Sequence, residues 1–215
     1  MKNIIFILIL FVLNIPCAFG IDYNKYDLYD IDSLRNITND YKNEFKNKQE
    51  TVDAENSFNE FIKYYEKFVS IQNEKNLLSY NYFNPSKLLK EYTNKYYKYG
   101  LIVQIDEGEF FFVSSKRYMY KNFAKYLSKP HRKLLKFETR FDNRIINDCR
   151  YIISQSELKK ILEFYKKFEK EYPEYSKQNK IDNIIKKYKK DIEHYPYLIY
   201  WYVLSTKTFT CFSKK

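Results

Sequence analysis

Two cysteines beyond residue 20, Cys149 and Cys211, are the residues best suited to covalent chemistry in this sequence. An even number of cysteines in an oxidising compartment favours a disulfide. A bridge between these two would close a long loop and stabilise the fold by roughly 4 kcal/mol in the chain-entropy model. Two buried thiols that never meet account for the same residues equally well. A third alternative, which we favour less, makes Cys149 a nucleophile with His131 or His194 as its base.

Carboxylates are the second group with chemical potential, and three of them surround Gly108: Asp106, Glu107 and Glu109. Such a cluster can bind a cation or supply an acid and a base. A glycosidase, however, needs two carboxylates at a set separation in a cleft. We therefore interpret the cluster as a solvated turn. The alternative is a secreted hydrolase that uses Glu107 and Glu109, or the thiol of Cys149.

Several common chemistries lack their motifs here. His131 and His194 are isolated from each other and from any zinc-binding pattern, so we expect two surface histidines near helix ends. The chain has three glycines, which form neither a phosphate-binding loop nor the Gly-x-Ser-x-Gly turn of a hydrolase. We therefore expect no cofactor and no metal, and we consider an enzymatic role less favoured than binding.

The unusual features of the composition are basic and aromatic residues. The formal net charge is +11, and the chain has 24 Tyr and 18 Phe. Rings between basic residues can line a groove for a peptide or a glycan, and the predicted binding residues are Lys116, Arg117, Lys121, Arg132, Lys133 and Arg140. Ordinary solvated helices and A/T-rich codons also explain this composition. We therefore expect an envelope or secreted macromolecule as partner, disfavour nucleic acid, and leave the oligomeric state open.

The first 20 residues have the pattern of a secretory signal peptide. Lys2 precedes an apolar run over residues 4–12, and the small residues Ala18 and Gly20 stand at the cleavage spacing. We predict cleavage after Gly20 and a secreted or periplasmic protein. The best later apolar run, residues 197–204, is too short to cross a membrane.

The elements that position all these groups are predominantly helical. Apolar residues at helical spacing mark a helix from Thr51 onward: Phe58, Phe61, Ile62, Tyr65, Phe68 and Val69. Capping residues, proline and glycine delimit the others. We predict further helices over residues 85–100, from Ser114 or Ser115 to 127, from 130 onward, from 154 to about 173 and over 180–192, with a last helix or strand over 195–204.

One segment has the pattern of strands instead. Residues 101–105 and 110–113 are rich in β-forming residues and flank a turn with Gly108, so we predict a β-hairpin over about 101–113 that packs on helices. The predicted fold is mainly α, with a single helical domain over 51–215 that includes the hairpin. An N-terminal arm and first helix over 21–50 precede it. The predicted function is extracytoplasmic, non-enzymatic binding through an aromatic and basic surface.

Overall fold

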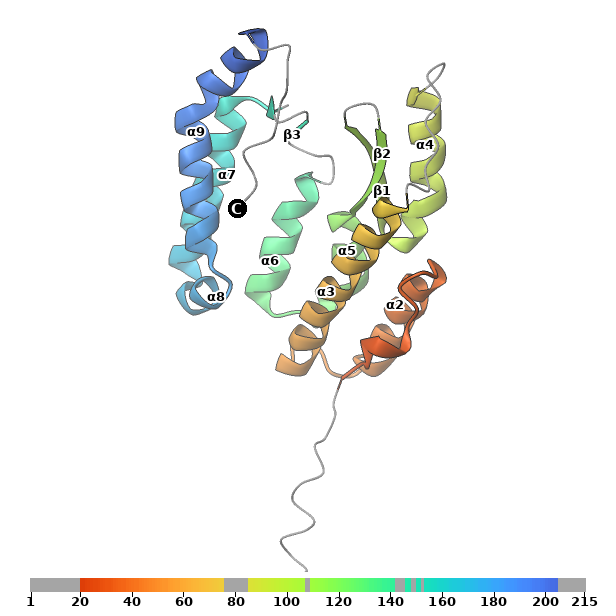
Figure 1. Cartoon of the computed structure of the whole chain (residues 1–215). Helices are drawn as coiled ribbons and strands as arrows, with labels where there is room; N and C mark the ends of the chain where they lie inside the picture. Colours follow the sequence, from red (N-terminus) through yellow and green to blue (C-terminus); the bar gives the residue numbers. More distant parts are fainter. Residues whose placement is uncertain are drawn as a thin grey trace, which may run out of the picture.

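The computed structural model describes residues 20–75, 85–106, 109–141, 146–147, 150–151 and 153–204. The fold is mainly α with a β-hairpin, which confirms the predicted class (Figure 1). The elements are η1 (Tyr23–Lys25), α2 (Asp32–Glu44), α3 (Val52–Glu74), α4 (Pro85–Tyr96), η2 (Tyr97–Tyr99), β1 (Leu101–Asp106), β2 (Glu109–Ser114), α5 (Lys116–Phe123), η3 (Ala124–Tyr126), α6 (Lys129–Glu138), η4 (Thr139–Phe141), β3 (Ile146–Asn147), β4 (Arg150–Tyr151), α7 (Gln155–Glu171), α8 (Pro173–Gln178) and α9 (Ile181–Leu204).

Local capping explains where several helices begin and end. Ser154 and Glu157 form the predicted capping box at the start of α7, and the Ser115 hydroxyl accepts from the Tyr118 N–H at the start of α5. Gly100 follows η2 in the left-handed region at φ 83°, which glycine adopts without strain. No helix within the described residues is both long and apolar enough to cross a bilayer.

The hairpin lies between two helices, with α4 against β1 and α3 against β2. The strands are antiparallel, and Val103 stands opposite Phe112, both buried. On the side of β2 that faces away from β1, the backbone of Phe112 faces α3. The Asn73 side chain of α3 makes both hydrogen bonds that a third strand would make there. The Phe112 N–H donates to Asn73 Oδ1 at 2.7 Å, and Asn73 Nδ2 donates to the Phe112 carbonyl at 3.0 Å. This edge of the hairpin is therefore closed by a side chain.

The buried side chains form two clusters, and α6 contributes to both. Residues of α2, α3, the hairpin and α5 make the first cluster, whereas α7 and α9 supply most of the second. Leu135 of α6 belongs to the first cluster, while Leu134 and Phe137 belong to the second. Because neighbouring residues of one helix point in different directions, α6 joins the α7–α9 layer to the rest of the molecule (Figure 1).

The last helix is longer than the sequence pattern indicated. A helix over 180–192 and a separate helix or strand over 195–204 were expected, but α9 continues from Ile181 to Leu204. Residue 196 is proline, which has no N–H to donate to the carbonyl four residues earlier, that of Ile192. Gln155 of α7 supplies the missing donor, because its Nε2 lies 3.1 Å from the Ile192 carbonyl oxygen. A contact from another helix thus compensates for the proline.

This compensation can be measured. Gln155→Met is expected to lower the free energy of unfolding by about 1–2 kcal/mol, since it leaves the Ile192 carbonyl without its donor. In a Pro196→Ala background, the new N–H of residue 196 can bond that carbonyl, so Gln155→Met should cost about 1 kcal/mol less. Urea unfolding of the four proteins of this double-mutant cycle gives the coupling. Equal costs in the two backgrounds would contradict the assignment.

Candidate functional site

The six basic residues predicted to bind a partner lie on α5, on α6 and just after α6, and five of them make contacts within the protein. The contacts are Lys116 Nζ to Glu138 Oε2 at 3.2 Å, Arg132 to Glu50 at 2.5 Å, the Lys133–Glu171 ion pair, Arg117 Nε to the Thr139 carbonyl at 3.4 Å, and the Arg140 guanidinium at 5.4 Å from the Phe137 ring centroid. Lys121 lies in the last turn of α5. These contacts hold α6 in place, and binding through the six residues stays a prediction.

The prediction of two surface histidines is wrong for His131. Its side chain is only 12% exposed, and its Nδ1 lies 3.0 Å from Glu55 Oε1 of α3. Burial alone would raise the pKa of Glu55, but hydrogen bonds from His131 and Ser128 outweigh burial and hold that pKa below its ordinary value. The α3–α6 contact therefore buries the ring with a partner. His194, in contrast, is exposed, with its Nδ1 2.7 Å from the Lys190 carbonyl oxygen.

Ser128, His131 and Glu55 are the residue types of a hydrolase triad, but they are not arranged as one. The Ser128 N–H, rather than its hydroxyl, donates to the Glu55 carboxylate, at 3.2 Å. The Ser128 hydroxyl oxygen is buried and makes no hydrogen bond, so no nucleophile is bonded to the imidazole. The group holds the start of α6 against α3.

The remaining predicted sites, the two cysteines and the carboxylates around Gly108, lie mostly outside the described residues. Cys149, Cys211 and Glu107 lie outside the described residues, so the disulfide, the thiol nucleophile and the hydrolase alternative stay predictions. Glu109 begins β2 opposite Asp106 of β1. Among the described residues, no group of three or more His, Cys, Asp or Glu is placed to hold a metal ion.

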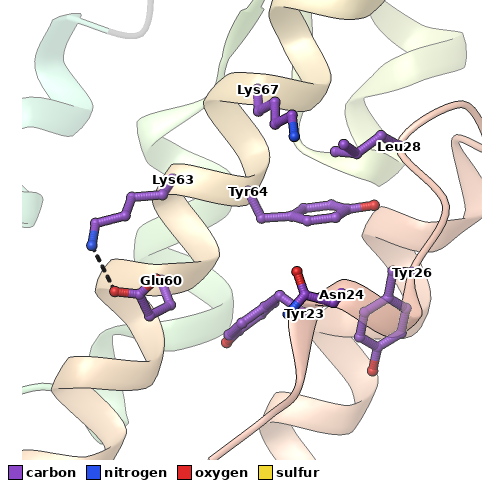
Figure 2. A pocket seen from close by; sticks show the side chains of 8 residues that line it. All are labelled: Tyr23, Asn24, Tyr26, Leu28, Glu60, Lys63, Tyr64 and Lys67. Atoms are coloured by element: carbon purple, nitrogen blue, oxygen red, sulfur yellow. Dashed lines mark hydrogen bonds and ion pairs between the residues drawn. The ribbon is translucent and has the colours of Figure 1, made fainter.

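A pocket of about 270 Å³ lies between the N-terminal arm and α3, and three tyrosines line it. We call it the tyrosine pocket. The arm and η1 contribute Tyr23, Asn24, Tyr26 and Leu28, and α3 contributes Glu60, Lys63, Tyr64 and Lys67. The four residues of α3 follow the i, i+3, i+4, i+7 spacing of one helix face. In Figure 2, Tyr64 crosses the middle of the pocket, between Lys67 and Leu28 on one side and Tyr23 and Asn24 on the other.

Hydrogen bonds of the tyrosine hydroxyls fix the arm on α2 and α3. Tyr23 donates to the Ser57 carbonyl at 2.8 Å, and Tyr64 donates to the Asp27 carbonyl at 3.0 Å. The third hydroxyl, that of Tyr26, lies 2.5 Å from Asp40 Oδ2. The ring of Tyr64 lies 6.3 Å from that of Tyr23 and 6.4 Å from that of Tyr26, between centroids. The three rings are therefore held in place before any ligand arrives.

Polar groups other than the tyrosine hydroxyls remain available to a ligand in this pocket. Lys67 and the Asn24 side chain are exposed, and neither makes a side-chain hydrogen bond or ion pair within the described residues. Glu60 is the single carboxylate among the residues that line the pocket, and it is paired with Lys63 at 2.6 Å. Because this pair is neutral overall, Lys67 leaves the rim with one net positive charge. The pocket thus offers aromatic surface, one amide and one free cation.

The three tyrosine hydroxyls of the pocket stay protonated around neutral pH, because the pKa of each is raised. Burial raises the pKa of Tyr64 to about 12 and raises the pKa of Tyr23 further. The hydrogen bond from Tyr26 holds the pKa of Asp40 below its ordinary value, and Lys25 contributes in the same direction. The phenols are therefore neutral hydrogen-bond donors while Asp40 is ionised.

Comparisons with protein-family models, with curated proteins and with solved structures found no match for this chain. The function must therefore be argued from the site itself.

A second hollow of about 530 Å³ lies between α6, η4 and α7 and is more apolar. The rings of Phe137 and Phe164 stack there at 3.5 Å between centroids, and Phe141, Ile153 and Ile161 complete its apolar lining. Its border includes residues that flank 142–145, which lie outside the described part of the chain. The tyrosine pocket is the better candidate because none of its lining residues adjoins an undescribed segment.

Sequence reasoning missed the tyrosine pocket. The segment from Ile21 to Asp32 shows no clear period, and the predicted apolar stripe of α3 omits Tyr64. A signal was nevertheless present, since Tyr64 is an aromatic residue at helical spacing from Glu60 and Lys67 on the polar face. A ring among charged residues on a helix indicates that another segment covers it.

Proposed function

We propose that this protein is a non-enzymatic binding protein of the extracytoplasmic space, and that the tyrosine pocket holds one acidic sugar ring of an envelope or secreted glycan. The observation that carries the proposal is the set of three fixed tyrosine rings beside the unpaired Lys67. The leader-like residues 1–20 support the proposed location.

The size and composition of the pocket favour a sugar. A volume of about 270 Å³ is just below the roughly 300–1,000 Å³ of sites for drug-sized ligands, so it suits a single ring. The C–H face of a sugar packs on aromatic surface, and its hydroxyls can bond the Asn24 amide and the Glu60 carboxylate. The ammonium of Lys67 then favours a ring that bears a carboxylate.

The proposed affinity for one ring is weak, as expected for a glycan contact that is repeated along a polymer. A methyl glucuronide has about 14 heavy atoms, and about −0.3 kcal/mol per atom gives about −4 kcal/mol, a dissociation constant near 1 mM. Because the hydroxyls of Tyr23, Tyr26 and Tyr64 are already bonded, binding does not have to order those rings.

The test is an NMR titration of the exported chain with methyl glucuronide and with the uncharged methyl glucoside. We expect shifts at the rings of Tyr23, Tyr26 and Tyr64, with glucuronide binding about threefold to fivefold more tightly because of Lys67. Lys67→Gln should remove this preference, whereas Lys159→Gln, an exposed lysine of α7, should keep it. The mass of the exported chain should also correspond to a first residue Ile21.

Four outcomes would contradict the proposal. Titration without shifts at the pocket rings would show that the site does not bind such a ring. Equal affinity for the two sugars, or a preference that Lys67→Gln leaves unchanged, would remove the role of the lysine. A chain that keeps residues 1–20 after expression in a secreting host would contradict the proposed location.

A further inference from the structure

The segment that forms α5 and η3 carries a basic surface beside α2. Residues 116–127 include four basic residues and neither Asp nor Glu. Lys121 of α5 and Lys125 of η3 stand four residues apart, so they lie on the same side of this segment, and both are exposed. Lys42 of α2 lies beside them, since its Nζ bonds the Asn122 side chain. We call Lys42, Lys121 and Lys125 the lysine cluster.

The ammonium of Lys42 is held in place by a neutral acceptor. Its Nζ donates to Asn122 Oδ1 at 2.5 Å, and Asn122 Nδ2 donates to the Tyr118 carbonyl at 2.9 Å, which fixes the orientation of the amide. Lys42 makes no ion pair within the described residues. Because an amide oxygen is uncharged, this hydrogen bond fixes the position of the ammonium and leaves its charge uncompensated.

The carboxylates closest to the lysine cluster in sequence already have other cations as partners. The ion pairs are Asp40 with Lys25 at 3.1 Å, Glu44 with Lys48 at 2.8 Å and Glu50 with Arg132 at 2.5 Å. Lys121 and Lys125, in contrast, make neither an ion pair nor a side-chain hydrogen bond in the part of the chain that the structure describes, and Lys125 Nζ lies over the Tyr126 ring. The cluster therefore presents three positive charges with no negative partner.

The three ammonium groups lie close enough to repel one another. Burial holds the pKa of Lys42 below its ordinary value, and the charges of Lys125 and Lys121 lower that pKa further, with no carboxylate to offset them. Like charges gathered in this way destabilise the folded state. An anion that binds between them would remove the repulsion, and it would stabilise the folded protein.

We propose that the lysine cluster binds a doubly charged oxyanion, the phosphate or sulfate group of an ester. Each ammonium can donate to a different oxygen of such a tetrahedral group, and hydrogen bonds between charged partners are stronger than neutral ones. A carboxylate, with one charge and two oxygens, matches three cations less well.

This site is separate from the tyrosine pocket. Asp40, which bonds Tyr26 of that pocket, is two residues from Lys42 and therefore on the opposite side of α2. The inference thus goes beyond the proposed binding of an acidic sugar ring and does not depend on it.

The test is an NMR titration of the exported chain at pH 7 with inorganic phosphate, inorganic sulfate and chloride, all at one ionic strength. We expect phosphate and sulfate, but not chloride, to shift the side-chain amide signals of Asn122 and the ε-methylene signals of the three lysines. Dissociation constants should lie in the millimolar range, as expected for a few exposed charge pairs. Bound phosphate should also raise the pKa of Lys42, because an anion then lies beside its ammonium.

A matched pair of variants separates the cluster from the general positive charge of the protein. Lys121→Gln with Lys125→Gln should weaken phosphate binding by about tenfold. Lys95→Gln with Lys98→Gln removes the same charge from α4 and η2, where both lysines are exposed and lie over neighbouring rings, and should leave binding unchanged. In low salt without phosphate, the first pair should raise the urea midpoint more than the second, because it relieves the repulsion on Lys42. Circular dichroism checks that both pairs fold.

The same group on two carriers distinguishes its possible sources. Glucose 6-phosphate presents the phosphate on a sugar, and vesicles of phosphatidylcholine with phosphatidic acid present it on a lipid. The carrier that binds more tightly than inorganic phosphate identifies the source, and Lys121→Gln with Lys125→Gln should weaken its binding too.

The proposal is overturned if neither phosphate nor sulfate shifts the signals of Asn122. It is also overturned if chloride at the same ionic strength produces equal shifts, since that result would identify general screening of charge. An equal loss of phosphate binding in the two variant pairs would show that the net charge of the protein, rather than the lysine cluster, attracts the anion.

Discussion

Replacement of Phe123 by alanine is expected to lower the free energy of unfolding by about 3–5 kcal/mol, a large part of the stability of a domain. Phe123 of α5 is completely buried at the centre of an aromatic group. Its ring centroid lies 4.7 Å from that of Phe61, 4.9 Å from that of Tyr41 and 5.2 Å from that of Phe58. The ring therefore joins α5 to both α2 and α3, and its loss leaves a cavity that three other rings cannot fill without leaving their own contacts.

Urea unfolding followed by circular dichroism measures this loss. Phe123→Leu keeps most of the side-chain volume and should cost less than half as much as the alanine variant. Tyr97→Ala, which removes a ring from the surface, is the control and should stay within about 0.5 kcal/mol of the parent protein. A loss below about 1 kcal/mol for Phe123→Ala would show that the aromatic group can close over the gap.

The sequence alone was sufficient for much of the secondary structure, because the signals that mark those elements are local. The capping box of Ser154 and Glu157 lies within four residues, and Pro85 and Gly100 act on their own backbone. The apolar stripe that includes Phe58, Phe61 and Phe68 also repeats within one helix and is buried as expected. Hydrogen bonds and burial that involve residues this close in sequence can be predicted from residue types and spacing.

The candidate site was not predictable because its contacts join distant residues through groups that every residue has. Tyr23 bonds the carbonyl of Ser57, 34 residues away, and Tyr64 bonds the carbonyl of Asp27, 37 residues away. Every residue has a backbone carbonyl, so the residue types do not indicate which carbonyl a tyrosine bonds, and neither partner could be recognised. The pairing of His131 with Glu55 spans 76 residues and was missed for a related reason: many glutamates were equally plausible partners.

The same limit explains the misplaced break in the last helix. The second segment was set apart because residues 195–204 are apolar on every side, and Pro196 within it is a local signal against a continuous helix. The compensating donor, Gln155, lies 37 residues from Ile192 and belongs to another helix. Tertiary contacts therefore decided this case against a local rule, whereas Pro85 and Pro173 at helix starts obey the rule.

The abundant buried tyrosines lead to the second large effect: the protein is expected to unfold cooperatively as the pH rises above about 10. Burial raises the folded-state pKa of many tyrosines above the ordinary value of 10.0; the residues are Tyr23, Tyr41, Tyr64, Tyr65, Tyr118, Tyr165, Tyr175 and Tyr188. The unfolded chain therefore loses these protons first. The stability they contribute is fully present below pH 10 and is lost as the pH rises through the folded-state values.

The loss of unfolding free energy is large enough that the protein should unfold before most of these tyrosines ionise in the folded state. A tyrosine whose folded-state pKa lies above 12 loses about 2.7 kcal/mol of its contribution between pH 10 and pH 12, at about 1.4 kcal/mol per pH unit. The summed loss from a few such tyrosines exceeds the free energy of unfolding of a typical domain, about 5–15 kcal/mol. Tyrosinate absorbance and far-ultraviolet circular dichroism should therefore change together. Ionisation of most of the 24 tyrosines with the helical signal intact would contradict this expectation.

Tyr41→Phe gives the sharpest form of this prediction, because the sign of its effect should reverse with pH. The Tyr41 hydroxyl donates to the Ala54 carbonyl at 2.7 Å, so its removal should cost about 1 kcal/mol at neutral pH. In alkali, the parent protein is destabilised by the raised pKa of Tyr41, which results mainly from burial, whereas phenylalanine has no proton to lose. At about 1.4 kcal/mol per pH unit above 10, the two proteins should be equally stable near pH 11. Above that pH the variant should be the more stable of the two in urea unfolding, and a constant difference at all pH values would show that the Tyr41 hydroxyl ionises as readily in the folded protein as in the unfolded chain.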